Sequence, residues 1–509
     1  MTNPNWQTPA TKQGEEFEMI AKTFQGLETV LATELIDLGA NNIQLGRRMV
    51  SFTGNKELLY RANFQLRTAI RILMPIKYFR ATSADEVYDA VQEIDWTNYL
   101  TNDTTFAVDS VVFSTEFRHS KFVAYKVKDA IVDQMREKTG ERPNIQITNP
   151  DLQLHIHIAE YDCTLSLDTS GESLHRRGYR QETIEAPLNE VLAAGIIMLT
   201  GWKGDCDLID PMCGSGTIAI EAALIARGIA PGVYRKEYAF EKWPDFDQEL
   251  FDAIYEDDSR EHDFDHHIYG YDINRNAVAI ATTNVKAAGL SKEITIAQQD
   301  FADFKQPAEK AIIITNPPYG ERIPAPDLLG LYKMIGSKFK HDFTGNDAWV
   351  LSYREECFDQ IGLKPSLRTP LYNGSLECEL RKYQMFSGKF NEMRAEGGDI
   401  KTAQERRMMA DRKRFKQHRD FKEKLEEDPR DRFKRKEERE DIRRSDRRDF
   451  KRENRREEHR DFKRDDDRRE GRKDFRRDGD RHDFKRGGDR KEGRRDFRRD
   501  NGKPYSKKR

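Results

Sequence analysis

The stretch that decides the fold is DLIDPMCGSGT, residues 207–217. Its first four residues read as the end of a buried strand, and the turn after them leads into an apolar, helix-forming stretch, residues 218–227. Gly214 and Gly216 let the backbone pass close to a ligand, and the N–H groups that begin the helix are free to bind it. The turn is neither a dinucleotide GxGxxG nor a phosphate-binding loop, because no lysine follows the second glycine. Asp210 at the head of the turn suits a ligand with a cationic amino group.

Two more strands follow, and each ends in a carboxylate. The segment IYGYD, residues 268–272, ends at Asp272, which can accept hydrogen bonds from a ribose diol. This acid lies farther downstream than the roughly 20 residues of a minimal unit. A polar, aromatic insertion at about residues 228–267 accounts for the excess. Asp300 closes the next strand and can accept from an adenine amine, with Phe301 against the ring.

The segment NPPYG, residues 316–320, comes directly after the apolar run AIIIT and indicates a reaction. An exocyclic aromatic amine is a poor nucleophile because its lone pair is delocalised into the ring. The side-chain oxygen of Asn316 and the backbone carbonyl of Pro317 can accept its two N–H bonds and aim the lone pair at an electrophile. Pro318 shapes the turn, and Tyr319 can stack on a flipped or unpaired base. By itself, the segment is equally typical of a tight turn that closes a buried strand.

The order of these elements carries more information than any one of them. Each acid alone is more typical of a solvated strand end than of a ligand contact. Together, the glycine turn, Asp272, Asp300 and NPPYG fall at the C-terminal ends of successive strands, where open α/β sheets bind ligands. Over about residues 185–386 the chain resembles the class I S-adenosylmethionine-dependent methyltransferases that methylate amines. Residues 370–378, read as two strands around an Asn-Gly turn, match the antiparallel hairpin that completes the methyltransferase sheet.

The resemblance implies a Rossmann-like α/β class I methyltransferase domain over residues 191–390, with S-adenosylmethionine as the cofactor. The implied cofactor contacts are Asp210, Cys213, Gly214, Ser215, Gly216, Thr217, Asp272, Asp300, Phe301 and Asn316. The implied catalytic residues are Asn316, Pro317, Pro318 and Tyr319, which would align the amine for in-line displacement of the methyl group.

Two small α+β units precede this domain. The first, residues 16–76, contains a strand, a helix at 27–38 and two short strands. The second, residues 77–170, contains a helix at 121–138 among alternating strands. Their order resembles the ferredoxin-like and THUMP modules of a family of RNA-modifying enzymes. The segment FQGLE, residues 24–28, is characteristic of the start of the first helix in that family.

Residues 171–190 link the second unit to the methyltransferase domain and are rich in arginine. Arg176, Arg177 and Arg180 flank Tyr179, and three guanidiniums on a turn can grip phosphates while the ring stacks on an unpaired base. A solvated linker is the alternative. The segments DTSGESLHRRGYR and EAPLNE in this part of the chain resemble the linker of the bacterial 23S rRNA guanine-N2 methyltransferases.

This resemblance implies methylation of the exocyclic N2 amine of a guanine in 23S rRNA, with RNA as the partner. Arg118 and Lys121, at the start of the helix in the second unit, are further candidate RNA contacts, although a basic helix start is often simply exposed. Three alternatives stay open: the same chemistry on tRNA, methylation of adenine N6, and a non-catalytic RNA-binding or ribosome assembly factor. Larger bifunctional relatives carry a second methyltransferase domain where this chain has a charged tail, so no second modification is expected.

Charge is distributed unevenly along the 509 residues. A mean hydropathy of −0.87 with 35% charged residues predicts that part of the chain does not pack. Residues 401–509 hold 46 basic and 30 acidic side chains, a net of +16, whereas residues 1–400 hold 42 and 60, a net of −18. The tail, residues 397–509, repeats Arg-Asp-Phe-Lys and is expected to be disordered. It is expected to add sequence-tolerant RNA binding, and a solubilising appendage is the alternative.

Several classes of site and location are not indicated. The five cysteines show neither CxxC nor Cys/His ligand spacing, so we expect neither a disulfide framework nor a metal site. Residues 1–15 are polar and expected to be disordered, and no apolar run of 18 residues occurs. The sequence therefore predicts a cytoplasmic protein without a membrane partner.

Overall fold

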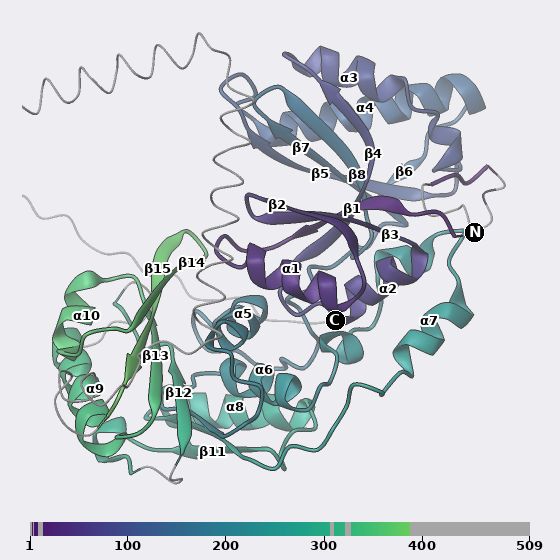
Figure 1. Cartoon of the computed structure of the whole chain (residues 1–509). Coiled ribbons are helices and arrows are strands. Elements are labelled where there is room, and N and C mark those ends of the chain that lie inside the picture. Colours follow the sequence, from purple (N-terminus) through teal and green to yellow (C-terminus); the bar gives the residue numbers. More distant parts are fainter. Residues whose placement is uncertain (1–2, 4, 9–13, 306–309, 321–326, 387–509) are drawn as a thin grey trace, which may run out of the picture. The chain divides into compact units, whose positions relative to one another are not determined.

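The computed structural model describes residues 3, 5–8, 14–305, 310–320 and 327–386 (Figure 1). The strands of these residues form one eight-stranded and one seven-stranded sheet. The predicted disordered tail, residues 397–509, lies outside the described residues.

The eight-stranded sheet contains both predicted N-terminal units, in the strand order β2-β3-β1-β4-β8-β7-β5-β6. Its strands are β1 (Phe17–Lys22), β2 (Asn41–Gly46), β3 (Met49–Gly54), β4 (Arg71–Arg80), β5 (Thr105–Phe113), β6 (Asn144–Ile145), β7 (Leu152–Ala159) and β8 (Asp162–Asp168). Its helices are α1 (Glu28–Asp37), α2 (Lys56–Gln65), α3 (Ala84–Gln92) and α4 (Ser120–Thr139).

Strand β4 connects the two units, because the predicted boundary between residues 76 and 77 falls inside it. Its first residues pair with β1, and residues 73–80 pair with β8. The register shifts between Pro75 and Lys77, as expected where a proline interrupts a ladder. One hydrophobic cluster extends beneath both parts of the sheet. The two units therefore share a sheet and a core.

The N-terminal segment, predicted to be disordered, contributes to this core. Trp6 is 8% exposed and packs between Tyr99 and Trp243. The backbone N–H of Gln7 donates to the carbonyl of Asn98 at 3.2 Å. The prediction of disorder is therefore wrong at Trp6, because this indole buries apolar area that the polar residues around it do not reveal.

The seven-stranded sheet has the order β11-β10-β9-β12-β13-β15-β14. Its strands are β9 (Asp207–Asp210), β10 (Ile268–Asp272), β11 (Ile294–Gln298), β12 (Ala311–Thr315), β13 (Asp347–Ser352), β14 (Leu367–Asn373) and β15 (Leu376–Gln384). The helices are α5 (Glu190–Thr200), α6 (Thr217–Ala226), α7 (Gln248–Tyr255), α8 (Arg275–Ala287), α9 (Leu328–Asp342) and α10 (Glu355–Ile361). Strands β9 to β13 are parallel, and β15 and β14 run antiparallel to their neighbours.

Helices cover both faces of this sheet, which explains its nearly continuous apolar strands. Successive residues of a strand point to opposite faces. Leu208 packs in a cluster with α5 and α6, whereas Ile209 packs in a cluster with α9 and α10. Figure 1 shows these two helix layers on opposite sides of the strands. This arrangement confirms the predicted α/β class.

The hairpin β14–β15 forms as predicted, with its turn one residue later than expected. Asn373 is the last residue of β14 and pairs with Leu376, so the turn residues are Gly374 and Ser375. Gly374 has a φ of +65°, which a glycine adopts without strain.

The predicted insertion, residues 228–267, joins the second sheet to the core of the first. It contains two short 3₁₀ turns and α7. The ring of Phe240 stacks on Tyr60 with centroids 4.5 Å apart, and Phe251 packs edge-on against both. The aromatic residues of the insertion are therefore part of the packing between the catalytic domain and α2.

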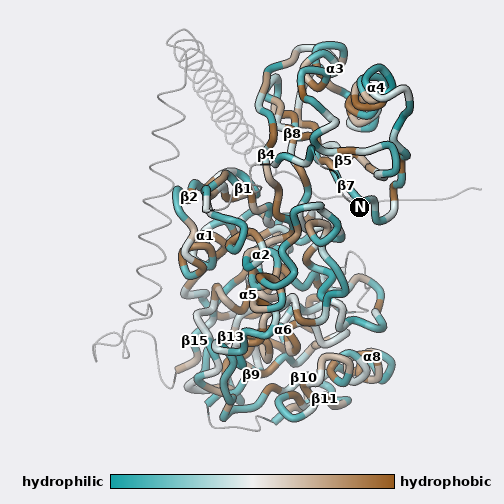
Figure 2. The backbone as a smooth tube through the Cα atoms, turned by 90° about the vertical axis from the view of Figure 1, so that its right-hand side faces the viewer, coloured by the Kyte–Doolittle hydropathy of each residue, from teal (hydrophilic) through white to brown (hydrophobic). Residues whose placement is uncertain are grey.

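Hydrophobic residues lie mainly on the strands, for example on β4 and β8, while the loops around α3 are hydrophilic (Figure 2). Within the described ranges, no helix is both long and apolar enough to cross a membrane.

Candidate cofactor and substrate site

A pocket of about 580 Å³ opens where β9, β10, β11 and β12 end. The strand order reverses between β9 and β12, and ligands of open α/β sheets bind at such a reversal. The predicted site residues that line the pocket are Asp210, Cys213, Gly214, Ser215, Thr217, Asp272, Asp300, Phe301, Asn316, Pro317, Pro318 and Tyr319. The fold therefore brings together motifs from four separate strand ends.

The glycine turn is held tightly against its surroundings. Gly214 and Gly216 have φ values of +56° and +82°, which favour glycine. A Cβ on Gly214 would lie 2.8 Å from Cδ1 of Ile184, and one on Gly216 would lie 3.2 Å from Cβ of Ala281. Gly216 is the N-cap of α6 and, unlike Gly214, is not among the described residues that line the pocket, so its predicted contact with the cofactor stays a prediction. Both glycines are therefore required by local packing and conformation.

Asp272 is fixed at the end of β10 by backbone donors. Its Oδ2 accepts from the N–H of Gly214 at 3.0 Å, and its Oδ1 accepts from the N–H of Asn274 at 2.8 Å. Each carboxylate oxygen has a second lone pair. The carboxylate is thus oriented beside the glycine turn and can still accept from a diol.

Asp210 is 1% exposed and borders the same pocket. Burial raises the pKa of Asp210 to about 8, and the nearby Asp272 carboxylate adds to the shift. A buried acid of this kind is stabilised in its charged form by a cation. The site therefore fits a ligand that carries an amino group.

The end of β11 contributes one polar and one apolar group. Asp300 is exposed, and its Oδ1 accepts from the N–H of Ala302 at 2.9 Å. Phe301 is 4% exposed and packs against Phe304 and Phe343. Both residues border the pocket, so an aromatic ligand could contact the phenyl ring beside an exposed carboxylate.

Asn316, directly after β12, carries an unpaired polar atom. Its Oδ1 is buried and, within the described part of the chain, accepts no hydrogen bond. A buried polar group left unpaired costs about 1–3 kcal/mol. The Asn316 amide is therefore suited to gain a donor from a bound substrate.

Tyr319, three residues later, is 8% exposed and borders the pocket. Its hydroxyl accepts from Nδ2 of Asn373 at 2.6 Å, and its ring meets Tyr353 edge-on at 5.4 Å. The ring is therefore held in one orientation beside Asn316, and base stacking stays a prediction.

A further part of the pocket wall was not among the predicted site residues. Residues 183–188 of the linker, here called the strap, line the pocket, as do Leu331 and Met334 of α9. Residues 185–188 belong to the EAPLNE segment of the predicted linker, and the three-dimensional path of the chain brings them to the glycine turn.

For Arg177 and Tyr179 the predicted role in RNA binding is wrong, because both side chains lie in the interior. Each is 2% exposed. Arg177 Nε lies 3.4 Å from Oε1 of Glu221, and the Tyr179 hydroxyl donates to the same oxygen at 2.9 Å. Glu221 is fully buried on α6. A buried guanidinium needs a carboxylate partner, and here α6 supplies one.

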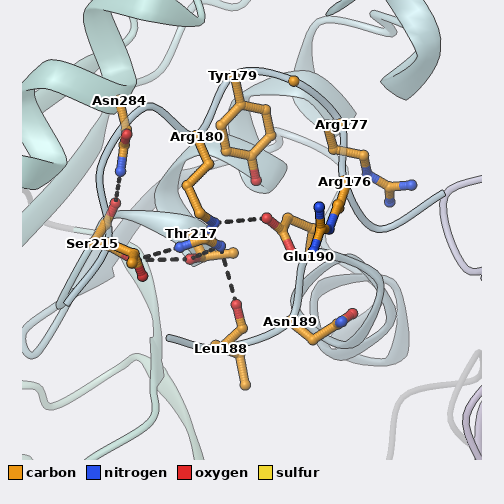
Figure 3. A network of polar contacts seen from close by, with 12 residues as sticks. Arg176, Arg177, Tyr179, Arg180, Leu188, Asn189, Glu190, Ser215, Thr217 and Asn284 are labelled. Carbon is orange, nitrogen blue, oxygen red and sulfur yellow. Dashed lines mark hydrogen bonds and ion pairs between the residues drawn. The ribbon is translucent and has the colours of Figure 1, made fainter. Parts of the chain in front are cut away.

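The remaining predicted RNA contacts differ in exposure. Arg180 points toward the glycine turn and not toward solvent (Figure 3), which contradicts its predicted role. Arg176 has a side chain 67% exposed and pairs with Glu172 at 2.6 Å. Arg118 and Lys121 are exposed at the start of α4. These three stay candidate contacts.

No group of three or more His, Cys, Asp or Glu side chains that could hold a metal occurs among the described residues. All five cysteines lie among the described residues and are buried.

Comparison with known protein families matches three consecutive parts of the chain. Residues 18–73 match the RlmL ferredoxin-like domain, residues 81–168 match the THUMP domain, and residues 177–382 match the RMKL-like methyltransferase domain. The matches follow the order of units predicted from the sequence.

Individual relatives give the same result. A Synechocystis protein, provisionally named an RNA methyltransferase, is 38% identical over 72% of this chain and 96% of its own length. The ribosomal RNA large subunit methyltransferase K/L of Syntrophotalea carbinolica is 39% identical over 72% of this chain and 53% of its own. The chain therefore spans about half the length of that relative.

A solved structure extends the comparison to three dimensions. The crystal structure of SMU.472, provisionally described as a methyltransferase and complexed with SAH, aligns with a TM-score of 0.66. It is 31% identical and covers 74% of this chain and 100% of its own. The glycine turn, the three acids and the buried Asn316 Oδ1 all border one pocket, and together with these matches they lead to one conclusion. The chain belongs to the RMKL-like methyltransferase family, with ferredoxin-like and THUMP domains before its catalytic domain, and is an S-adenosylmethionine-dependent methyltransferase.

Proposed function

We propose that the enzyme methylates the exocyclic N2 amine of a guanine in 23S rRNA. The observation that carries the proposal is the Oδ1 of Asn316, which is buried at the pocket and has no hydrogen-bond partner among the described residues. An amine donates two N–H bonds, and Asn316 together with the Pro317 carbonyl offers two acceptors on adjacent residues.

The other residues divide into cofactor and base contacts. S-Adenosylmethionine would supply an electrophilic methyl group on a sulfonium. Asp272 would accept from the ribose, Asp300 from the adenine amine, and Asp210 would pair with the cofactor's amino group. Tyr319 would stack on the guanine, and Pro318 would keep the turn rigid. Proximity and alignment then account for most of the acceleration, because a sulfonium is already a good leaving group.

Two observations support RNA as the substrate. The K/L relative is named for large-subunit ribosomal RNA. On α4, Phe122 is 52% exposed and Tyr125 is 59% exposed, on one helix face beside Lys121. Exposed rings among basic side chains suit unpaired bases and phosphates. The proposal concerns only the part of the chain that matches that relative, and it implies a cytoplasmic enzyme.

Asn316→Ala tests the role of the amide. Removing an oriented hydrogen bond of this kind typically lowers turnover about 10²-fold or more. Cofactor affinity should stay within a few fold, because Asn316 is assigned mainly to the amine. Asn316→Asp keeps acceptor oxygens and should retain more turnover than the alanine variant. An alanine variant with more than about a tenth of wild-type turnover would exclude the role.

Nucleoside mass spectrometry of rRNA and tRNA from a deletion strain tests the substrate. The proposal expects loss of one N2-methylguanine from 23S rRNA, restored by the wild-type gene but not by Asn316→Ala. Loss from tRNA, or loss of an N6-methyladenine, would replace the proposal. An unchanged nucleoside profile would favour a non-catalytic RNA-binding factor.

A further inference from the structure

The guanidinium of Arg180 connects the glycine turn to the linker (Figure 3). Its Nη1 donates to Oγ of Ser215 at 2.8 Å, and its Nη2 donates to Oγ1 of Thr217 at 2.9 Å. On the linker side, Nη2 also donates to the carbonyl of Leu188 at 3.2 Å, and Nε donates to Oε1 of Glu190 at 2.7 Å. One side chain thus donates hydrogen bonds to four acceptors in two segments.

Asn284 of α8 makes a second connection between the same two segments. Its Nδ2 donates to the carbonyl of Ser215 at 3.1 Å and to that of Glu182 at 3.0 Å. Its Oδ1 accepts from the N–H groups of Gln181 and Glu182 at 2.9 and 3.2 Å. Asn284 is 1% exposed, so the oxygen and the nitrogen of its amide both form their hydrogen bonds inside the protein.

The strap, residues 183–188, runs between these two points of attachment. It forms one wall of the pocket, and Ile184 lies against Gly214. Neither Arg180 nor Asn284 is among the described residues that line the pocket. The two side chains therefore contact the pocket wall from behind and are not placed to touch a ligand.

We propose that Arg180 and Asn284 are positioning residues that hold the strap and the glycine turn in the arrangement that binds the cofactor. The inference rests on the proposed function, in which this pocket takes S-adenosylmethionine. The planar guanidinium presents its donors in a fixed fork, which suits four acceptors in fixed positions. Without these bonds the strap has more conformations, and a ligand must supply the free energy of ordering it.

Calorimetric titration with S-adenosylhomocysteine tests the inference on the full-length protein. Arg180→Ala and Asn284→Ala should each weaken binding about tenfold, a typical coupling within one hydrogen-bond network. The cofactor affinity of Arg180→Lys should lie between those of wild type and Arg180→Ala, because the lysine ammonium can reach Glu190 but cannot satisfy four acceptors. Arg176→Ala, four residues away and exposed, is the matched control and should leave cofactor affinity unchanged.

Two further measurements separate positioning from a general loss of structure. Amide hydrogen exchange in residues 181–189 should be faster in Arg180→Ala and unchanged in Arg176→Ala. In methyl transfer, the KM for the cofactor should rise while kcat at saturation stays near wild type. If Arg180→Ala is too unstable to assay, Arg180→Lys combined with Thr217→Val in a double-mutant cycle should still show coupling in cofactor affinity.

The outcomes are distinct. Wild-type protein that fails to bind S-adenosylhomocysteine would overturn the assignment of the pocket and this inference with it. Wild-type binding with equal affinity in Arg180→Ala and Asn284→Ala, and with unchanged exchange in the strap, would overturn the positioning role alone. A fall in kcat at unchanged cofactor affinity would also contradict it.

Discussion

Arg177→Met is expected to destabilise the protein strongly, because it removes one partner of a buried ion pair. Arg177 is 2% exposed, and its Nη1 donates to the carbonyl of Leu174 at 2.9 Å. Burial alone would lower the pKa of Arg177, but the Glu221 carboxylate holds it above its ordinary value. The Arg177 guanidinium is therefore charged. Methionine fills much of the same volume but removes the guanidinium that donates to Glu221, which leaves the nearby Arg67 as its counter-charge.

The magnitude follows from the contacts that remain. Breaking a buried pair by removing one partner costs about 3–5 kcal/mol. Tyr179 still donates to Glu221 at 2.9 Å, which favours the lower end of that range. With an unfolding entropy of about 2.1 cal/mol/K per residue, a unit of roughly 380 residues loses about 4 °C in Tm for 3 kcal/mol.

Urea denaturation followed by circular dichroism measures the change. Arg176→Met is the matched control, since its exposed partner Glu172 contributes little, and it should stay within about 0.5 kcal/mol of wild type. The double variant Arg177→Met/Glu221→Met should recover much of the loss, because it removes both members of the pair while Arg67 keeps the Glu34 carboxylate nearby. If Arg177→Met were as stable as the control and bound RNA more weakly than wild type, Arg177 would not be an interior residue. It would instead be a contact for an RNA phosphate.

Three further predictions concern the cofactor and the tail. Asp272→Ala should weaken cofactor binding by about 1.5–3 kcal/mol, the value of hydrogen bonds to a charged group, and unchanged affinity in calorimetry would remove Asp272 from the site. Because the pKa of Asp210 is raised to about 8, the acid is largely protonated at pH 7 in the free enzyme. A bound amino group favours the ionised form, so affinity should rise between about pH 6 and 8 with release of a proton. Asp210→Asn should abolish that dependence. Deleting residues 401–509 should weaken RNA binding and flatten its salt dependence, with turnover at saturating RNA nearly unchanged. Equal affinities and slopes would leave the tail without a role in RNA binding.

Features governed by local sequence could be predicted closely. Strand β10 occupies the predicted residues 268–272, and α4 extends one residue beyond each end of the predicted helix, 121–138. Periodicity, glycine turns and strand ends are local signals, and the pocket is assembled from strand ends. The motifs around Asp272 and Asn316 therefore came together as expected.

Features that depend on distant partners could not be predicted. Trp6 looks like part of a polar terminus, and its packing needs Trp243 from the insertion. Arg177 looks like an RNA contact, and its burial needs Glu221, 44 residues later in the chain. The boundary expected at residue 76 falls in a strand whose two halves pair with different neighbours. In each case the partner lies far away in sequence, and local composition carries no information about it.

The backbone at Gly178 explains why Arg177 and Arg180 of the linker contact different parts of the protein. Its φ is +113°, and a Cβ there would lie 2.1 Å from the carbonyl oxygen of Tyr234. Only glycine allows this close passage, and the chain bends here beside Tyr234. Arg177 then meets Glu221, and Arg180 meets Glu190 and the glycine turn. An arginine-rich turn can thus bind phosphates at the protein surface or stabilise a pocket from the interior. Which of the two it does depends on the carboxylates that the fold places near each guanidinium.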